Sequence, residues 1–124
     1  MSEVVVVVLS RAKPGRGEDG LAAYSALAAT THGEDGCLAF ALHRDPSDAE
    51  RIVLIERWAS RAALDAHLQM PHLAEFRAST GDLWAEPATI LVLDPVASGD
   101  SAKGLLAAGS SAPRPPGSTA RGSV

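Results

Sequence analysis

Val4-Val-Val-Val-Val-Leu9, a run of six consecutive aliphatic residues, decides the fold of this chain. Side chains that branch at Cβ favour extended backbone, so the run and the Ser10 and Arg11 that follow it predict a strand over residues 4–11. Successive side chains of a strand point to opposite faces, and here both sets are apolar. Both faces of the sheet that contains this strand therefore need apolar cover.

The remaining segments alternate between helical and extended patterns. Ser60 is a predicted N-cap for a helix that carries Leu64 and His67, and Pro71 breaks that helix and begins another. The order β-α-β-β-α-β predicts a ferredoxin-like α+β fold, in which a four-stranded antiparallel sheet carries its helices on one face. The other predicted segments are a helix over residues 17–31 and strands over residues 37–44, 51–58 and 89–93.

A chain of 124 residues is long enough for one domain, because two smaller units could not each bury enough apolar surface. Its last thirty residues draw 21 members from Ser, Ala, Gly and Pro. Such a composition buries too little surface to offset the entropy lost on ordering. We therefore predict an ordered domain over residues 1–94 and a flexible tail over residues 95–124.

The second face of the sheet has no predicted cover within the chain. Two helices shield one face of a four-stranded sheet, and the other would be an apolar patch of a size that monomers avoid. Packing of two such faces against each other satisfies both copies, so we predict a homodimer through the sheet face. The alternative is that residues 95–124 cover this face.

Composition excludes several classes of function. The net charge is −4 and there is no block of Lys or Arg, so we expect no nucleic-acid partner. A run of six apolar residues is far shorter than the ~20 needed to span a bilayer, and we expect a cytoplasmic protein without a membrane partner. Gly15-x-Gly17-x-x-Gly20 matches a dinucleotide-binding pattern in its letters, but a second βαβ unit is missing, so no such cofactor is expected.

Glu56, Trp58 and His67 are the residues on which chemistry could depend. Glu56 lies in an otherwise apolar strand, on the same face as Leu54 and Trp58. A carboxylate there forms an ion pair or lines a pocket, and Trp58 is either a core residue or a pocket wall. His67 lies one turn after Leu64 on the apolar side of its helix, where a histidine is either a buried structural residue or a functional one.

The other histidines do not suggest a metal site. His67 and His72 are five residues apart, about 140° around a continuous helix, and Pro71 lies between them. That is a poor arrangement for two ligands of one ion, so we predict no metal. His32 is expected at a solvated helix end and His43 near the end of a strand.

Four stretches resemble the antibiotic biosynthesis monooxygenase (ABM) family, and most closely its small quinol monooxygenase branch. The longest are Ile52-Val-Leu-Ile-Glu-Arg-Trp-Ala-Ser60 and Leu64-Asp-Ala-His-Leu-Gln-Met-Pro-His72, which match the pattern E-x-W-x-S…L-x-A-H-L-Q-x-P-H. Lys13-Pro14-Gly15 and Glu34-Asp-Gly-Cys37 match two shorter motifs. The resemblance covers roughly residues 4–94, and its motifs carry little information about the substrate.

The resemblance implies a ferredoxin-like homodimer with a pocket between each sheet and its helices. It also implies oxidation of a small aromatic substrate by O₂ without flavin, haem or metal. His67 would act as the base or as a hydrogen-bond partner, because an imidazole exchanges protons near neutral pH. Trp58 and Phe76 would wall the substrate ring, and Glu56 and His72, in the same substrate pocket, would orient their neighbours.

Departures from the family narrow the activity. At the positions where polyketide-tailoring members carry an Asn and a Tyr, this chain carries Leu54 and Leu64, which we place in the predicted pocket. The chain has no Asn at all, and His67 and Arg77 stand where haem-degrading members carry Trp and His, which argues against haem. Two alternatives stay open: an isomerase acting on a small signalling or lactone metabolite, and a non-catalytic dimeric binding protein.

Overall fold

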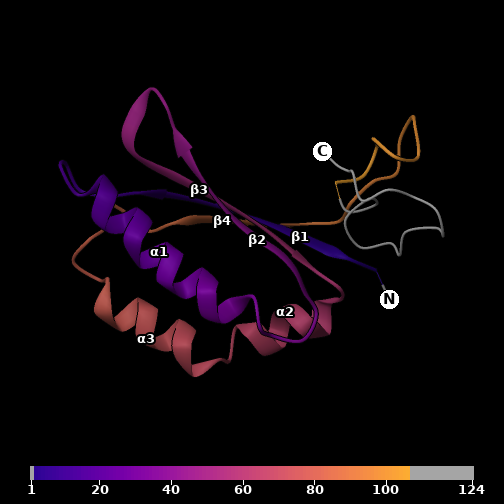
Figure 1. The fold of residues 1–124 in the computed structure, drawn as a ribbon, viewed down its shortest axis with the longest axis horizontal. Coiled ribbons are helices and arrows are strands. Elements are labelled where there is room, and N and C mark those ends of the chain that lie inside the picture. Colours follow the sequence, from indigo (N-terminus) through magenta and orange to yellow (C-terminus); the bar gives the residue numbers. More distant parts are fainter. Residues whose placement is uncertain (1, 107–124) are drawn as a thin grey trace, which may run out of the picture.

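The computed structural model describes residues 2–106 and contains one sheet with helices on one of its faces (Figure 1). The elements follow one another in the order predicted from the sequence, except that the second helical region consists of two short helices. They are β1 (Val4–Arg11), α1 (Gly17–Thr31), β2 (Cys37–Asp45), β3 (Asp48–Trp58), α2 (Arg61–His67), α3 (Pro71–Ser79) and β4 (Thr89–Leu93).

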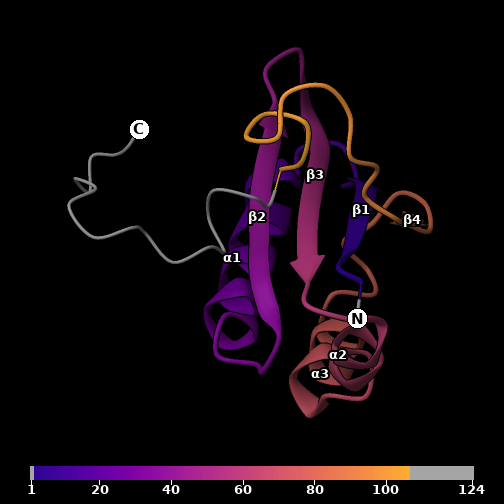
Figure 2. The ribbon, with the colours of Figure 1, turned by 90° about the vertical axis from the view of Figure 1, so that its right-hand side faces the viewer.

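The sheet has the order β2-β3-β1-β4, and each neighbouring pair is antiparallel. Each helical connection therefore skips one strand: β3 lies between β1 and β2, and β1 lies between β3 and β4. Figures 1 and 2 show α1, α2 and α3 on the same side of the strands. This arrangement confirms the predicted ferredoxin-like α+β fold.

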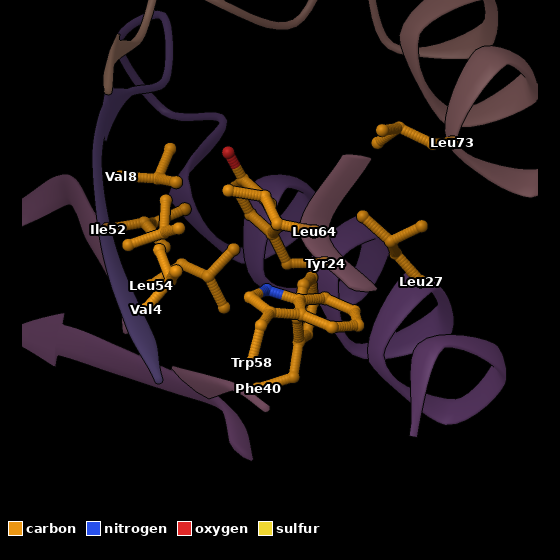
Figure 3. Packing of buried hydrophobic residues seen from close by; sticks show 11 residues of the cluster. Val4, Val8, Tyr24, Leu27, Phe40, Ile52, Leu54, Trp58, Leu64 and Leu73 are labelled. Atoms are coloured by element: carbon orange, nitrogen blue, oxygen red, sulfur yellow. The ribbon is translucent and has the colours of Figure 1, made fainter. Parts of the chain in front are cut away.

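The core lies between the sheet and the helices (Figure 3). The predicted alternation holds on β1, where Val4, Val6 and Val8 are buried against the helices and the residues between them are only half-buried. Tyr24 and Leu27 of α1 close the layer from the other side. The remaining buried members of this cluster are Phe40, Ile52, Leu54, Trp58, Leu64 and Leu73.

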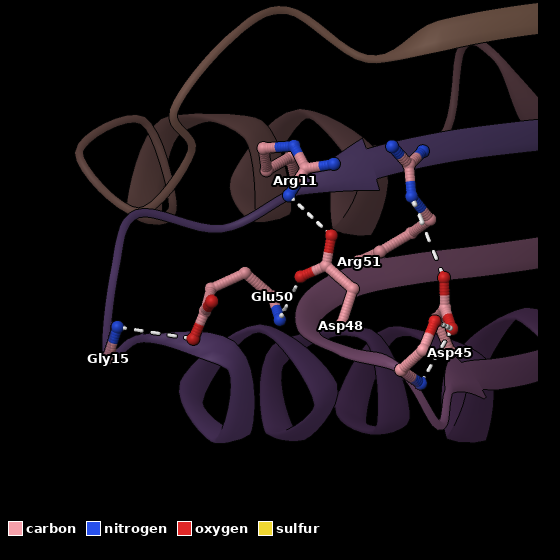
Figure 4. Close-up of polar contacts among 7 residues, drawn as sticks. Arg11, Gly15, Asp45, Asp48, Glu50 and Arg51 are labelled. Carbon is pink, nitrogen blue, oxygen red and sulfur yellow. Dashed lines mark hydrogen bonds and ion pairs between the residues drawn. The ribbon is translucent and has the colours of Figure 1, made fainter.

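One ion pair joins the β2–β3 hairpin to β1, and another lies within the hairpin (Figure 4). Arg11 pairs with Asp48 at 2.7 Å, and Arg51 lies 3.9 Å from Asp45. These contacts lie where β3 begins, three residues before the predicted start. The ladder extends there because Arg11 pairs with Arg51 and the amide of Ala12 donates to the carbonyl of Glu50.

The helix predicted to begin at Pro71 is short. The helix α3 ends at Ser79, and the Thr80 hydroxyl donates to the carbonyl of Phe76, which closes the last turn. Trp84 then forms an isolated bridge with Ala12. This bridge brings the chain back to the end of β1, and β4 then pairs with β1.

The outer face of the sheet, opposite the helices, remains apolar and accessible. Leu91 and Leu93 of β4 are 43% and 42% exposed, and Val7 and Ile55 of the central strands pair with each other on this face. Residues 95–106 form neither helix nor strand, and several of them line a second hollow together with Ser2, Glu3 and Val5. Of the predicted tail, residues 107–124 lie outside the described residues.

Within residues 2–106, no helix combines the length and the apolar character that crossing a membrane requires.

Candidate functional site

A cavity of about 750 Å³ lies between the sheet and the helices. Most of its wall is aliphatic or aromatic, with Val6, Val8 and Leu54 on the sheet side and Leu64 and Phe76 on the helix side. Its polar groups come from Ser10, Tyr24, Glu56, His67, Arg77, Thr80 and Glu86. An apolar hollow with a few polar side chains is the usual form of a site for a small organic ligand.

The structure brings five of the predicted site residues to this cavity: Leu54, Glu56, Leu64, His67 and Phe76. Trp58 and His72, which we expected there, do not line it, and those two predictions are corrected. Trp58 is fully buried at the end of β3, so its ring forms part of the core rather than a wall. His72 lies at the start of α3, where it bonds a carboxylate behind His67.

Trp58 supports two groups that do reach the cavity. Glu56 and Trp58 lie two residues apart on β3, on the face that the helices cover, and the indole Nε1 donates to Glu56 Oε1 at 2.8 Å. The indole ring also lies against the imidazole of His67, with 4.6 Å between ring centroids and 33° between planes. Trp58 therefore fixes the positions of Glu56 and His67 from behind.

Glu56 is a buried carboxyl group that faces the cavity. Burial raises its pKa, against the opposing effects of the Trp58 hydrogen bond and of His67. Glu56 is 5% exposed, and Trp58 is the hydrogen-bond partner of its carboxyl group among the described residues. Glu56 forms no ion pair with an Arg or Lys of the described residues, and it lines the cavity, so the structure supports the pocket interpretation of this residue.

His67 shares a second carboxylate with His72. Glu34 Oε2 accepts a hydrogen bond from His67 Nδ1 at 2.9 Å and another from His72 Nε2 at 2.6 Å. The side chains are buried to different degrees: His67 is 3% exposed, Glu34 6% and His72 21%. These three residues, which we call the Glu34 cluster, lie beside the cavity, and His67 alone of the three lines it.

A tight turn places Glu34 at this point. The amide of Cys37 donates to the carbonyl of Glu34, and Gly36 has a φ of +82°, which is the conformation that favours glycine at this turn position. A Cβ on Gly36 would lie 2.5 Å from the Cβ of Ala63. The turn therefore packs directly on α2, one helical turn before His67.

The two histidines reach one carboxylate because the helix is interrupted between them. The helix α2 ends at His67, and α3 begins at Pro71, so the 140° separation predicted for a continuous helix does not apply. The donor atoms of the Glu34 cluster lie within 4.8 Å of one another and are of types that bind divalent metals. Our argument from helical spacing against a shared site for His67 and His72 was therefore wrong in its geometry.

Polar contacts also occur at other points of the cavity wall. The hydroxyls of Ser10 and Tyr24 are hydrogen-bonded at 2.7 Å, and burial raises the pKa of Tyr24. The Trp84 indole donates to Thr80 Oγ1 at 3.1 Å. Tyr24, Phe76 and Trp84 form an aromatic group with centroids 5.0 to 6.4 Å apart. A ligand in the cavity therefore has both aromatic rings and hydroxyl groups within reach.

Three of these residues were not identified from the sequence. Tyr24 and Trp84 lie in apolar stretches of the sequence, where helical spacing does not separate a core aromatic residue from a pocket wall. Glu34 was noted as part of a motif without a role. That motif was the available signal, because it placed a carboxylate next to a turn that contains Gly36.

The chain belongs to the antibiotic biosynthesis monooxygenase family, whose pattern matches residues 3–79. It is 35% identical over 95 residues to Rv0793 of Mycobacterium tuberculosis, a protein named as a candidate monooxygenase, and the match covers 77% of this chain and 93% of Rv0793. The structure of Rv0793 superposes with a TM-score of 0.72 at 32% identity, covering 80% of this chain and all of that one. PA3566 from Pseudomonas aeruginosa superposes at 0.73 with 29% identity, covering 78% and 97%.

Proposed function

We propose that this protein is a cofactor-independent monooxygenase that oxidises a small quinol, or a related electron-rich aromatic compound, with O₂. The observation that carries the proposal is the cavity of about 750 Å³ with an aromatic and aliphatic wall, which His67 and Glu56 enter as buried polar groups. An apolar site suits a flat ring and excludes water from a reactive anion. Membership of the family supports the reaction class.

The proposed reaction converts a quinol and O₂ into a hydroxyquinone and water. His67 Nε2 takes the proton of one quinol hydroxyl, and the resulting quinolate passes one electron to O₂. The semiquinone and superoxide recombine with formation of a C–O bond, which gives a ring peroxide. His67 returns its proton to the outer peroxide oxygen, the O–O bond breaks, water leaves, and the ring carbon loses its hydrogen as a proton to become a carbonyl. All four electrons that reduce O₂ then come from the substrate.

Residues around His67 stabilise the charges that form. The imidazolium that results from proton uptake lies on the face of Trp58, where a cation–π interaction stabilises it. The raised pKa of Glu56 favours its neutral form, which can donate a hydrogen bond to the peroxide or to the substrate oxygen. Phe76 and Leu64 restrict the position of the ring from the helix side.

We also propose that two copies of the chain pair through the outer face of the sheet. This face carries half-buried and exposed aliphatic residues on its central and edge strands, including Val7, Ile55, Leu91 and Leu93. Isolated β-sheet faces of this kind are covered in stable proteins. Light scattering at micromolar concentration should give the mass of a dimer, and Ile55→Asp should give a monomer. A monomeric mass for the unsubstituted protein would refute the pairing.

Oxygen uptake tests the proposed function. Purified protein should consume O₂ faster than autoxidation when supplied with a reduced menadiol-type quinol, and His67→Ala should remove this increment. His43→Ala is the matched control, because His43 is exposed on β2 and does not line the cavity. Uptake that does not depend on His67 would reject the proposal. Uptake that EDTA abolishes would indicate a metal-dependent reaction instead.

A further inference from the structure

Glu34 has no contact with the cavity and yet bonds the residue that we propose as the base. Its carboxylate lies on a turn between α1 and β2, while His67 ends α2 and His72 is the second residue of α3. Three separate parts of the chain therefore meet at one oxygen atom. A carboxylate that is 6% exposed and accepts two N–H donors has a fixed position, since movement would leave both donors unpaired.

The contact with Glu34 determines which nitrogen of His67 is free. A carboxylate oxygen accepts hydrogen bonds, so the bond at 2.9 Å requires the hydrogen of the neutral imidazole to be on Nδ1. The lone pair is then on Nε2, which has no hydrogen-bonding partner among the described residues. Because His67 lines the cavity and Glu34 does not, Nε2 is the nitrogen that remains for a ligand.

His72 holds Glu34 from the opposite side. Its Nε2 lies 2.6 Å from the same oxygen, and the break between α2 and α3 makes this second contact geometrically available. The ring centroids of the two histidines are 6.3 Å apart, so each approaches the carboxylate from its own direction. His72 thus restrains Glu34 as Glu34 restrains His67.

We propose that Glu34 is a positioning residue: it holds His67 in the Nδ1–H tautomer, which turns a proton-accepting Nε2 toward the cavity, and it pairs with the imidazolium once Nε2 takes a proton. His72 fixes the carboxylate for this role. The proposal rests on the assignment of His67 as the base of the proposed reaction. When such a carboxylate is removed by substitution, the histidine base adopts the wrong tautomer and catalysis falls, even where the fold is unchanged.

The tautomer of His67 can be measured without any activity. Long-range ¹H–¹⁵N correlation spectra of ¹⁵N-labelled protein at pH 8 distinguish Nδ1–H from Nε2–H imidazole, and His67→Gln assigns the signals. We expect His67 in the Nδ1–H form in the unsubstituted protein and a shift toward Nε2–H in Glu34→Gln. An Nε2–H form in the unsubstituted protein would overturn the proposal, and this result needs no variant to fold.

Quinol oxidation supplies the second readout. Glu34→Gln should lower kcat by about 100-fold or more with little change in KM, because Glu34 does not touch the substrate. Asp35→Asn is the matched control: it removes a carboxylate from the same turn, where Asp35 is exposed, and should leave both constants unchanged. Glu34→Asp keeps the charge on a shorter side chain and should recover part of kcat. Equal losses in Glu34→Gln and Asp35→Asn would overturn the role of Glu34.

The two proposals fail in different ways. If the unsubstituted protein shows the Nδ1–H tautomer but does not oxidise quinols, the proposed function is wrong and the structural role of Glu34 stands. If it oxidises quinols and Glu34→Gln keeps the full kcat, the role of Glu34 is wrong. Binding of one equivalent of Zn²⁺ in calorimetry, lost in His72→Ala, would overturn the proposal in favour of a metal site at the same three residues.

Discussion

Gly36→Ala should lower the free energy of unfolding by more than the cost of placing alanine at a positive φ. A non-glycine residue in the left-handed region costs about 1–2 kcal/mol. At Gly36 the added Cβ would also lie 2.5 Å from the Cβ of Ala63, a contact that requires the turn and α2 to separate. Overpacking of this kind adds about 1–3 kcal/mol. The sum predicts a loss of about 2–5 kcal/mol in the free energy of unfolding.

Gly15→Ala is the control for the backbone contribution. Gly15 has a φ of +80°, nearly the same as Gly36, but a Cβ there meets no atom within 4 Å. Its loss should therefore be the conformational cost alone, about 1–2 kcal/mol. Urea denaturation at one fixed protein concentration measures both variants, since pairing of two copies would make the apparent stability depend on concentration.

Ala63→Gly separates the steric cost from every other effect. Combined with Gly36→Ala it removes the atom that the new Cβ meets, so the double variant should be more stable than the sum of the single losses by about 1–3 kcal/mol. Additivity within about 0.5 kcal/mol would show that the turn does not press on α2. In that case the explanation of how Glu34 reaches His67 would be wrong.

Three further outcomes follow from buried or paired polar groups. Burial raises the pKa of Glu56, so the native state binds the proton of this carboxyl more tightly than the unfolded chain does, and the free energy of unfolding should fall as pH rises above 4.5. Glu56→Gln should remove that fall in urea titrations from pH 4 to 8. Parallel dependence of stability on pH in the variant and the unsubstituted protein would contradict this. Tyr24→Phe should cost about 1 kcal/mol, and thermal unfolding should show that it and Ser10→Ala together cost less than the sum of the two. The hydrogen bond from Arg11 lowers the pKa of Asp48, so this carboxylate stabilises the protein above pH 3.8, and the stabilisation is lost as pH falls through the lowered pKa of the native state. Asp48→Asn should therefore weaken the loss of stability at acid pH. An unchanged loss at acid pH would contradict this.

The sheet and its partner helices could be predicted because their signals are local. Five valines in succession favour a strand whatever surrounds them, and the boundaries predicted for β1, α1 and β4 agree with the structure. Ser60 caps α2 as expected, with its hydroxyl accepting from the amide of Ala63. The start of β3 could not be predicted from the sequence, because Asp48, Ala49 and Glu50 extend the strand only through pairing with its neighbours.

The sequence identified most residues of the candidate site, but it did not predict how their side chains are arranged. Glu56 and His67 were identified because a charged or imidazole group on an apolar face requires an explanation. Trp58 was misplaced because alternation fixes the face of the sheet that a side chain joins, but not whether that point is core or cavity. The contact between Glu34 and His67 joins residues 33 apart in the chain, and a sequence without a structure carries no signal for such a distance.

Oxygen labelling tests the central claim that the cavity supports insertion of oxygen into a quinol. Under ¹⁸O₂ and with menadiol-type substrate, the account predicts one ¹⁸O atom in each molecule of hydroxyquinone product and the other in water, with incorporation lost in His67→Ala. Formation of unlabelled quinone together with hydrogen peroxide would contradict it, because the protein would then transfer electrons to O₂ without forming a C–O bond.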